Sequence, residues 1–462
     1  MKTKQVWSLG VILAVLLAGV VVRQMQKPAE LATEEFTSLD LSFQQDKVQK
    51  IDISKPRNAS EEQYSSLSKD AEGWKSASMN GARADQGKIE ELLKALDGIK
   101  GELRGRGKKL FADFGIDDDH AYVIALADAA GKNILKVYIG NKITPQQSIF
   151  IRREGSDSVY ISDAGLFNQI GINGDPASAN LANDFWAATD MVHFESAKIN
   201  RLEIKRKVNG REVSAASVKK ENGVWKFTRA ELPFPADETK VKQYLDGIKT
   251  WRAQRAVKAE AGKDFGFDKN EWQLTLGVEG GNELTLTAGN AAPEGNGHYF
   301  KSSSEPVFFQ LGNYYYENLD ADDSQFFPDN FLKVDPDKTQ KLIIYSQKRS
   351  WEFSPADKKW EELTKYLEEL KTFRFERILF DDNAAKSVSK PVNWIEIQKT
   401  DETVPEVIEA GGAALGGSKE YAVRMKQAPG IVFSISESNF KKLFENLDRL
   451  AEPDPLSQKK SS

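Results

Sequence analysis

Three short motifs return in the same order at an almost constant spacing, and this internal repeat limits the possible folds more than any other feature of the chain. The offsets between the two copies lie between 149 and 151 residues. The motifs are Trp-Lys at 74–75 and 225–226, Leu-Asp-Gly-Ile-Lys at 96–100 and 245–249, and Phe-Gly-x-Asp at 114–117 and 265–268. Ordered matches at one offset predict a duplicated structural unit, because coincidences would not keep both order and distance.

Each unit is predicted to hold one main helix and a run of strands. The segment that ends at Leu96 has apolar residues at helical spacing, and so has the segment that ends at Ile248. Downstream, period-two alternation between Gly, Asn and Asp turns predicts strands. These strands are expected at 122–126, 135–139, 149–152 and 159–161, and again at 272–276, 284–286, 298–301 and 307–310. The predicted fold class is α+β, with tandem antiparallel meander sheets that each pack against one main helix.

A third, more diverged copy is also predicted. Residues 351–354 parallel residues 225–228, and a segment with helical spacing follows up to Leu370. The Phe-Gly-x-Asp step is missing there, and residues 378–382 are expected in its place. The predicted organisation is an N-terminal anchor at 1–28, repeats at 29–182, 183–335 and 336–451, and a disordered tail at 452–462.

The repeated motif residues are predicted to have structural roles. The tryptophans are expected to fill the seam between helix and sheet, and the phenylalanines to lie in the core. The aspartates are expected to cap or turn the chain into the next strand. The predicted core set is Trp74, Phe114, Gly115, Asp117, Trp225, Phe265, Gly266, Asp268 and Trp351.

An uncharged apolar run from Trp7 to Val22 lies between two basic flanks and predicts a transmembrane signal anchor. Its apolar positions are Trp7, Leu9, Val11, Ile12, Leu13, Val15, Leu16, Leu17, Val20, Val21 and Val22. A cleaved signal peptide and a buried core helix are the alternatives, although valines occupy the expected cleavage zone. The short flank with Lys2 and Lys4 favours an N-in orientation, with the body outside the cytoplasm.

Composition excludes several classes of function. The chain has no cysteine, which excludes disulfides, iron–sulfur clusters, thiolate zinc sites and lipoprotein processing. Its 64 basic and 69 acidic residues give a net charge of -5, so nucleic acid is not an expected partner. The histidines, His120, His193 and His298, are far apart and form no metal-binding motif. No catalytic residue, cofactor or metal site is predicted, and we expect a non-enzymatic protein.

Three charged segments are interpreted as solvent-exposed. The basic segment 101–109 is predicted to be a solvated turn, since it lacks the residues of a phosphate loop. The acidic clusters at 117–119 and 320–323 lack the spacing of a calcium loop, so loop solvation and turn capping are expected. An envelope hydrolase is a rival hypothesis, and it would require these carboxylates to converge within about 10 Å.

The chain resembles the bacterial domain-of-unknown-function family 4340. The features that carry this resemblance are the anchor, the tryptophan strand, the helix, the Phe-Gly-x-Asp loop and the Gly-Asn turns at 140–141 and 289–290. The resemblance covers most of the chain after the anchor, and the third copy departs from it. It implies a single-pass protein of the bacterial inner membrane with its C-terminal body in the periplasm. It also implies an ABC-type permease and ATPase complex, similar to those of gliding-motility machinery, as the partner. The family has no known catalytic or binding residues to carry over.

The sequence therefore predicts an accessory or scaffold protein of an envelope ABC-type transport complex. The alternative is a periplasmic ligand-binding module for polysaccharide or lipid. That alternative requires a pocket lined by aromatic side chains, for which Phe308, Tyr314, Tyr315 and Tyr316 are the candidates. The small-molecule ligand itself is unknown.

Overall fold

The computed structural model describes residues 39–55, 64–140 and 148–447, apart from 164, 180, 233, 261, 270, 318, 320, 329–331, 333, 358, 359, 417 and 446. The predicted anchor at 1–28 and the predicted tail at 452–462 lie outside these residues. In the part of the chain that is described, no helix is both long and apolar enough to cross a membrane. The chain divides into two compact units, of which the first ends at Ala187 and the second begins at Ala188.

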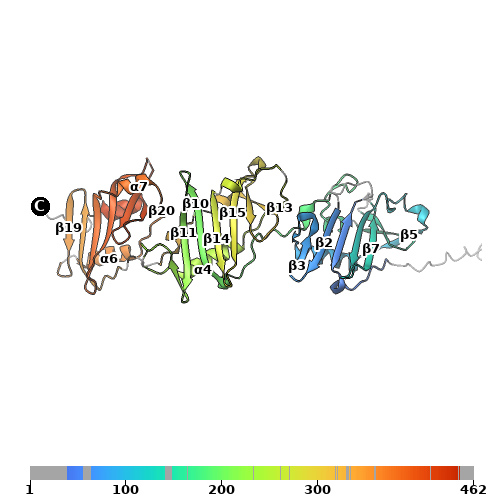
Figure 1. The fold of residues 1–462 in the computed structure, drawn as a ribbon, viewed down its shortest axis with the longest axis horizontal. Helices are drawn as coiled ribbons and strands as arrows, with labels where there is room; N and C mark the ends of the chain where they lie inside the picture. The colour runs from blue at the N-terminus through green and yellow to red at the C-terminus, as the bar shows by residue number, and fades with distance from the viewer. Residues whose placement is uncertain are drawn as a thin grey trace, which may run out of the picture. The chain divides into compact units, whose positions relative to one another are not determined.

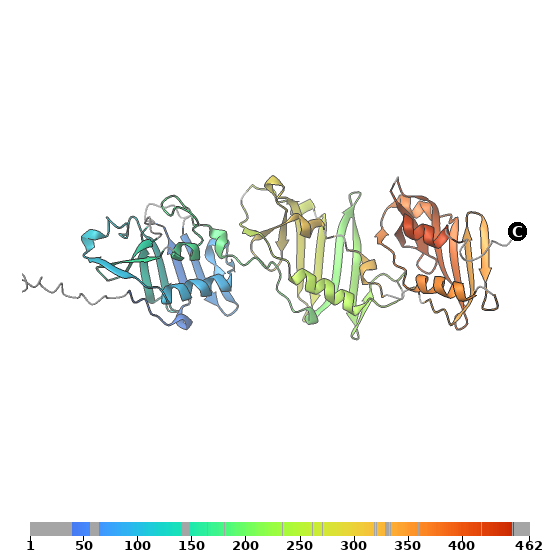
Figure 2. The same ribbon diagram turned by 180° about the vertical axis from the view of Figure 1, so that it is seen from behind.

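The first unit contains one nine-stranded antiparallel sheet with the order β4-β3-β2-β1-β6-β7-β8-β9-β5. Figure 1 shows this sheet, with β2, β3, β5 and β7 labelled. Two helices, α2 (Gln86–Asp97) and α3 (Gly165–Gln169), pack against each other on the face that is seen in Figure 2. The strands are β1 (Lys50–Ser54), β2 (Tyr64–Asp70), β3 (Gly73–Ser76), β4 (Ala82–Arg83), β5 (Glu102–Arg106), β6 (Tyr122–Ala127), β7 (Asn133–Ile139), β8 (Ser148–Arg153) and β9 (Ser158–Asp163).

The second unit begins with an eight-stranded antiparallel sheet of order β12-β11-β10-β14-β15-β16-β17-β13, accompanied by helices α4 (Glu238–Lys249) and α5 (Asn313–Glu317). Its strands are β10 (Ile199–Val208), β11 (Arg211–Glu221), β12 (Val224–Phe227), β13 (Arg255–Val257), β14 (Trp272–Val278), β15 (Glu283–Ala291), β16 (His298–Ser302) and β17 (Phe308–Leu311). The order matches that of the first sheet, apart from the short edge strand β4.

A third sheet, also in the second unit, has seven strands in the order β19-β18-β21-β22-β23-β24-β20. Its strands are β18 (Thr339–Ser346), β19 (Arg349–Phe353), β20 (Arg377–Leu379), β21 (Asn393–Lys399), β22 (Glu406–Ala414), β23 (Glu420–Met425) and β24 (Val432–Ser436). Its helices are α6 (Trp360–Lys371), α7 (Asp382–Ser387) and α8 (Glu437–Phe444). We use the word module for each sheet with its helices, at 39–187, 188–328 and 334–447.

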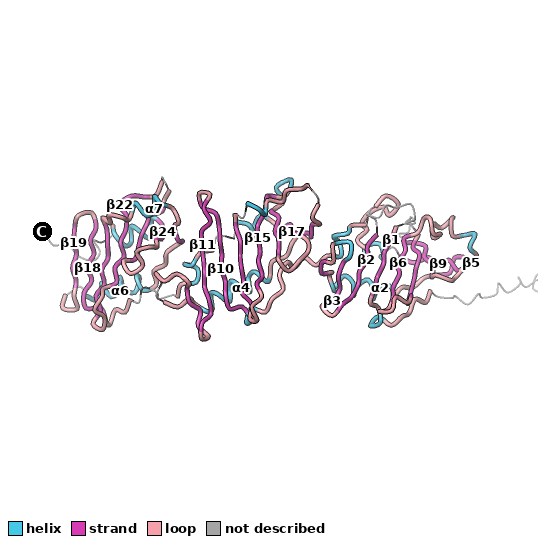
Figure 3. The backbone as a smooth tube through the Cα atoms, viewed as in Figure 1, coloured by secondary structure: helices cyan, strands magenta, loops and turns pink. Residues whose placement is uncertain are grey.

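In every module the main helix lies across one face of its sheet (Figures 2 and 3). Helix α2 buries the apolar stripe that ends at Leu96, and α4 buries Val241, Leu245 and Ile248. Each of these helices begins after an aspartate whose side chain accepts backbone N–H bonds, Asp85 for α2 and Asp237 for α4. The predicted α+β class with antiparallel meanders and main helices is therefore confirmed.

The prediction of a turn at 101–109 is wrong, although the segment is exposed or half-buried as expected. Residues Glu102–Arg106 form β5, which pairs with β9 at the far edge of the first sheet. The strands β13 and β20 hold the same edge position in the other two sheets. The main helix therefore carries the chain from one edge of the sheet to the other. The strand was missed because all five of its residues are exposed or half-buried, and it lacks an alternating apolar pattern.

The third module has one strand fewer before its main helix than the second. There β19 pairs directly with β18, next to β21, whereas β12 of the second module is separated from β10 by β11. Trp351 and Trp225 therefore occupy different strand positions, although both are buried. Their sequence similarity does not reflect the same place in the sheet.

Candidate functional site

The repeated Phe-Gly-x-Asp loop of the second module passes under a meander strand. Gly266 has a φ of 78°, which glycine adopts at little cost. The backbone carbonyl of Phe265 lies so close to Gly289 that a Cβ placed there would be 2.3 Å from its oxygen. The neighbouring Asn290 amide donates a 2.7 Å hydrogen bond to the same carbonyl. In the second module the Gly-Asn pair therefore holds the loop against the sheet, and we call the close approach of the loop carbonyl to the meander glycine the loop lock.

The first module has the same lock. Gly115 has a φ of 63°, and a Cβ added at Gly140 would lie 2.6 Å from the Phe114 carbonyl oxygen. The Phe114 ring packs on Phe150, with ring centroids 4.3 Å apart. The role of this glycine could not be seen in the sequence, because the contact joins segments about two dozen residues apart.

The third module keeps the close approach with different residues. A Cβ added at Gly411 of β22 would lie 2.9 Å from the Ser387 carbonyl oxygen at the end of α7. The prediction that residues 378–382 replace the Phe-Gly-x-Asp step is therefore wrong. Ile378 and Leu379 lie in β20, and the chain reaches the meander glycine only after α7.

The two motif aspartates differ in their surroundings. Asp117 accepts hydrogen bonds from the backbone amides of Asp119 and His120 at 2.8 and 3.1 Å, and it pairs with the His120 ring at 2.8 Å. Asp268 is exposed, and no described residue bonds to its carboxylate. The tryptophans Trp74, Trp225 and Trp351 are 4–6% exposed. The motif aspartate thus caps the turn in the first module, as expected, and is an exposed carboxylate in the second.

Two adjoining hollows lie beside this carboxylate in the second module. Their volumes are about 400 and 460 Å³, and both are lined by Phe267, Asp268 and Lys301. Volumes of this size fall within the range of small-molecule sites. The first hollow is also lined by Gln273, Thr285, Thr287 and Ser303, and the second by Gly262 and Phe308, among others. The strand residues among them, Gln273, Thr285 and Thr287, face away from the main helix, since the alternate side chains of the same strands form the core.

The second acidic cluster joins the second and third modules. Asp323 is fully buried and accepts hydrogen bonds from the Ser217 amide at 2.7 Å and from Arg229 Nε at 2.5 Å. Asp322 is 3% exposed and accepts a 2.6 Å bond from the amide of Ile378 in β20. The Asp323 carboxylate is thus bonded within the second module, and the neighbouring Asp322 carboxylate is bonded to the third. The expected loop solvation is wrong for this pair, while Asp322 does cap the following turn through the Ser324 amide.

Burial governs the protonation of these carboxylates. It raises the pKa of Asp323 to about 6, although the nearby Arg229 guanidinium acts in the opposite direction. Burial also raises the pKa of Asp322. Two arginines of this region also pack on one aromatic ring. The guanidinium carbons of Arg206 and Arg229 lie 5.2 and 5.5 Å from the Phe380 ring centroid. This contact region is a buried polar junction rather than a solvated loop.

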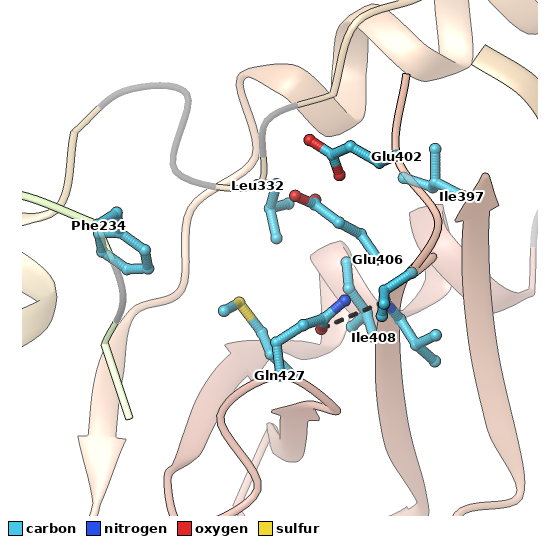
Figure 4. Close-up of a pocket in the computed structure, with 10 residues that line it drawn as sticks. Phe234, Leu332, Ile397, Glu402, Glu406, Ile408 and Gln427 are labelled. Atoms are coloured by element: carbon cyan, nitrogen blue, oxygen red, sulfur yellow. Dashed lines mark hydrogen bonds between the residues drawn. The ribbon is translucent and has the colours of Figure 1, made fainter. Parts of the chain in front are cut away.

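A small apolar pocket of about 180 Å³ lies at the same junction (Figure 4). Phe234 and Leu332 face strands of the third module across it, among them the strand that carries Ile408. Its carboxylates, Glu402 and Glu406, lie 2.9 and 3.7 Å from the buried Lys399 ammonium. The pocket is smaller than typical small-molecule sites, so it suits one apolar side chain better than a ligand.

The predicted aromatic pocket does not form. Tyr314 is 71% exposed, and Tyr315 packs on Trp251 with ring centroids 5.6 Å apart. Tyr316 stacks on His298 at 3.6 Å and lines a hollow with Trp272, whereas Phe308 lines the hollow beside Phe267. Within the described residues, no group of three or more His, Asp or Glu side chains is placed to hold a metal ion.

The fold and its motifs define a tandem array of α+β modules whose signature residues fix the backbone. The family model described as Domain of unknown function (DUF4340) matches the chain at residues 74–233 and 225–393. The matches begin at Trp74 and Trp225, the tryptophans of the repeated strand, and together they cover more than half of the chain. The chain belongs to this family. No curated protein and no solved structure matches it.

Proposed function

We propose that this protein is a non-enzymatic accessory or scaffold protein of an ABC-type transport complex. Its N-terminal segment would anchor it in the bacterial inner membrane, with the modules in the periplasm. The observation that carries the proposal is that a meander glycine of each module, Gly140, Gly289 or Gly411, serves a close backbone contact rather than chemistry. A signature devoted to packing leaves the surfaces of the modules for partners, which is how repeat proteins bind.

The partner and the membrane location are supported by the apolar run at 7–22 and by the family resemblance. Crosslinking in native membranes tests them. A photoreactive residue placed at the exposed Tyr314 or Val404, which are 71% and 67% exposed, should capture a permease or ATPase subunit. Deletion of residues 1–28 should release the protein from the membrane fraction and abolish capture. Recovery of neither subunit from either position would contradict the transporter association.

The alternative, a periplasmic module that binds polysaccharide or lipid, is favoured by one observation. The two hollows beside Phe267 lie in the size range of ligand sites, and polar side chains form much of their lining. Such a lining suits a polysaccharide better than an acyl chain, because burying hydroxyl and amide groups under a hydrocarbon leaves them without hydrogen bonds.

A further inference from the structure

In the first module, three large side chains cover the Phe-Gly-x-Asp loop. The Arg152 guanidinium lies over the Tyr138 ring, 3.4 Å from its centroid, and 4.5 Å from the Phe111 centroid. Its Nε donates a 2.6 Å hydrogen bond to the Ile116 carbonyl, and its Nη2 pairs with Asp118 at 3.1 Å. The Arg152 side chain is 8% exposed, so this face of the loop is closed by the protein itself.

The matching positions of the second module carry smaller groups. Thr287 lies two residues before the lock glycine, where the first module has Tyr138, and its cross-strand partner is Lys301 in place of Arg152. Gly262 lies three residues before the motif phenylalanine, where the first module has Phe111. The loss of both rings coincides with the two hollows, which are lined by these replacements.

The groups left in the hollows are suited to a polar ligand with one apolar face. The rings of Phe267 and Phe308 are half-buried and lie 4.7 Å apart, which offers an aromatic surface. No described residue is a hydrogen-bond or ion-pair partner of the Asp268 carboxylate or the Lys301 ammonium, so both are available to bond a ligand. Three acidic and two basic side chains line the hollows, namely Glu260, Asp264, Asp268, Lys263 and Lys301. This near balance favours an uncharged ligand.

We infer that the second module binds an uncharged saccharide chain of extended shape, such as a β-1,4-linked pyranose chain, across these two hollows. A pyranose ring would pack its C–H face on Phe267 and bond through its hydroxyls to Asp268 and Lys301. The row Gln273, Thr287 and Lys301 crosses neighbouring strands and offers further polar groups to the next sugar unit. An extended chain suits the site because the two hollows adjoin, sharing Phe267, Asp268 and Lys301, and because the polar row continues across three neighbouring strands. The inference specifies the ligand-binding alternative above and does not depend on the transporter proposal.

Calorimetric titration of the full-length protein tests this inference. Cellotetraose and chitotetraose are the probes, and maltotetraose, which is curved, is the control ligand. At least one of the extended probes should bind with a dissociation constant below about 1 mM, and maltotetraose should bind about tenfold more weakly or not at all. The variant Phe267→Ala should weaken binding about tenfold or more. The double variant Thr287→Tyr/Lys301→Arg, which copies the first module, should do the same with an unchanged melting curve.

A matched control is Lys220→Ala, on β11 of the same sheet and outside both hollows, which should bind as the unaltered protein does. The inference is overturned if neither extended probe binds at about 10 mM, a concentration that would reveal even weak sites. It is also overturned if binding persists in both the Phe267 variant and the double variant, or if maltotetraose binds equally well. The titration contains no transporter, so its failure and the failure of the crosslinking experiment are separate results.

Discussion

The first and second modules share a strand order and a loop lock, yet they differ at the face that the loop helps to form. In the first module Arg152 packs on the rings of Tyr138 and Phe111, whereas Lys301 in the second module is exposed beside open hollows. The shared parts are backbone contacts, in which a glycine admits a carbonyl that no other residue would admit. The comparison shows that a few glycine contacts fix the duplicated backbone. The side chains on the opposite face can therefore differ and either close that face or leave hollows in it.

The largest expected effect is that of breaking the shared lock. Gly289→Ala should lower the free energy of unfolding of the second unit by about 3 kcal/mol or more, because the new Cβ meets the rigid Phe265 carbonyl. Gly140→Ala should act similarly on the first unit. Urea unfolding and hydrogen exchange of the strand peptides measure both effects. A loss below about 1 kcal/mol in both variants would contradict the lock.

The difference between the modules is tested by truncating the two matching cations. Arg152→Ala should destabilise the first unit by about 2–3 kcal/mol, since it removes buried packing and leaves the Ile116 carbonyl without its bond. Lys301→Ala should change the stability of the second unit by less than about 0.5 kcal/mol, because its side chain is exposed. Equal effects in the two urea-unfolding experiments would mean that the modules do not differ as described.

The junction of the second and third modules should make stability depend on pH. The pKa of Asp323 is raised in the folded protein to about 6, above the value of about 3.9 for an unfolded chain. Between these values the folded state holds a proton that the unfolded state releases, so the free energy of unfolding should fall as pH rises, by about 2–3 kcal/mol in total. Asp322 should act in the same direction.

Asp323→Asn is the matched variant for this dependence, because the amide is nearly the same size and does not titrate. Its unfolding free energy, measured in urea from pH 4 to 7, should have a smaller slope than that of the unaltered protein. Parallel profiles for the two proteins would contradict the role given to Asp323.

The smallest expected effect concerns the identical peptide Leu-Asp-Gly-Ile-Lys. Gly247 lies inside α4, and no atom beyond the helix's own neighbouring backbone lies within 4 Å of an added Cβ. Gly98 is instead the C-cap of α2, outside the helix interior where alanine stabilises most. Gly247→Ala should therefore raise the free energy of unfolding by about 0.5–1 kcal/mol, measured as a higher melting temperature. Gly98→Ala should give no such gain in stability. An equal gain in both variants would contradict the difference between the helix-interior and the C-cap glycine.

Much of the fold could be predicted from local patterns. The helical spacing up to Leu96 and Ile248 located α2 and α4, and the alternation after the Phe-Gly-x-Asp loop located the meander strands. The edge strands β5, β13 and β20 could not be predicted in this way, because they are short and receive their hydrogen bonds from strands more than forty residues later. The buried pair Asp322 and Asp323 was missed because an acidic sequence gives no sign of which carboxylates the fold will enclose.

The candidate site shows the same division. The Phe-Gly-x-Asp repeat could be recognised in the sequence. Its structural role could not, because the loop carbonyl contacts the distant glycines Gly140 and Gly289. The hollows of the second module were invisible, since they arise from Gly262, Thr287 and Lys301, which are far apart along the chain. No pattern of neighbouring residues marks such a site.

The sequence by itself determined that the chain is a duplicated α+β array, because periodicity decides locally which side of a helix or strand is apolar. Only the tertiary structure decided where Asp322 and Asp323 are enclosed, how the meander glycines receive the loop, and which copy of the loop is closed by Arg152. The physical reason is that these features depend on which segments cross in space. The contribution of a buried carboxylate or of a close carbonyl to stability depends on a partner that lies far away in the sequence.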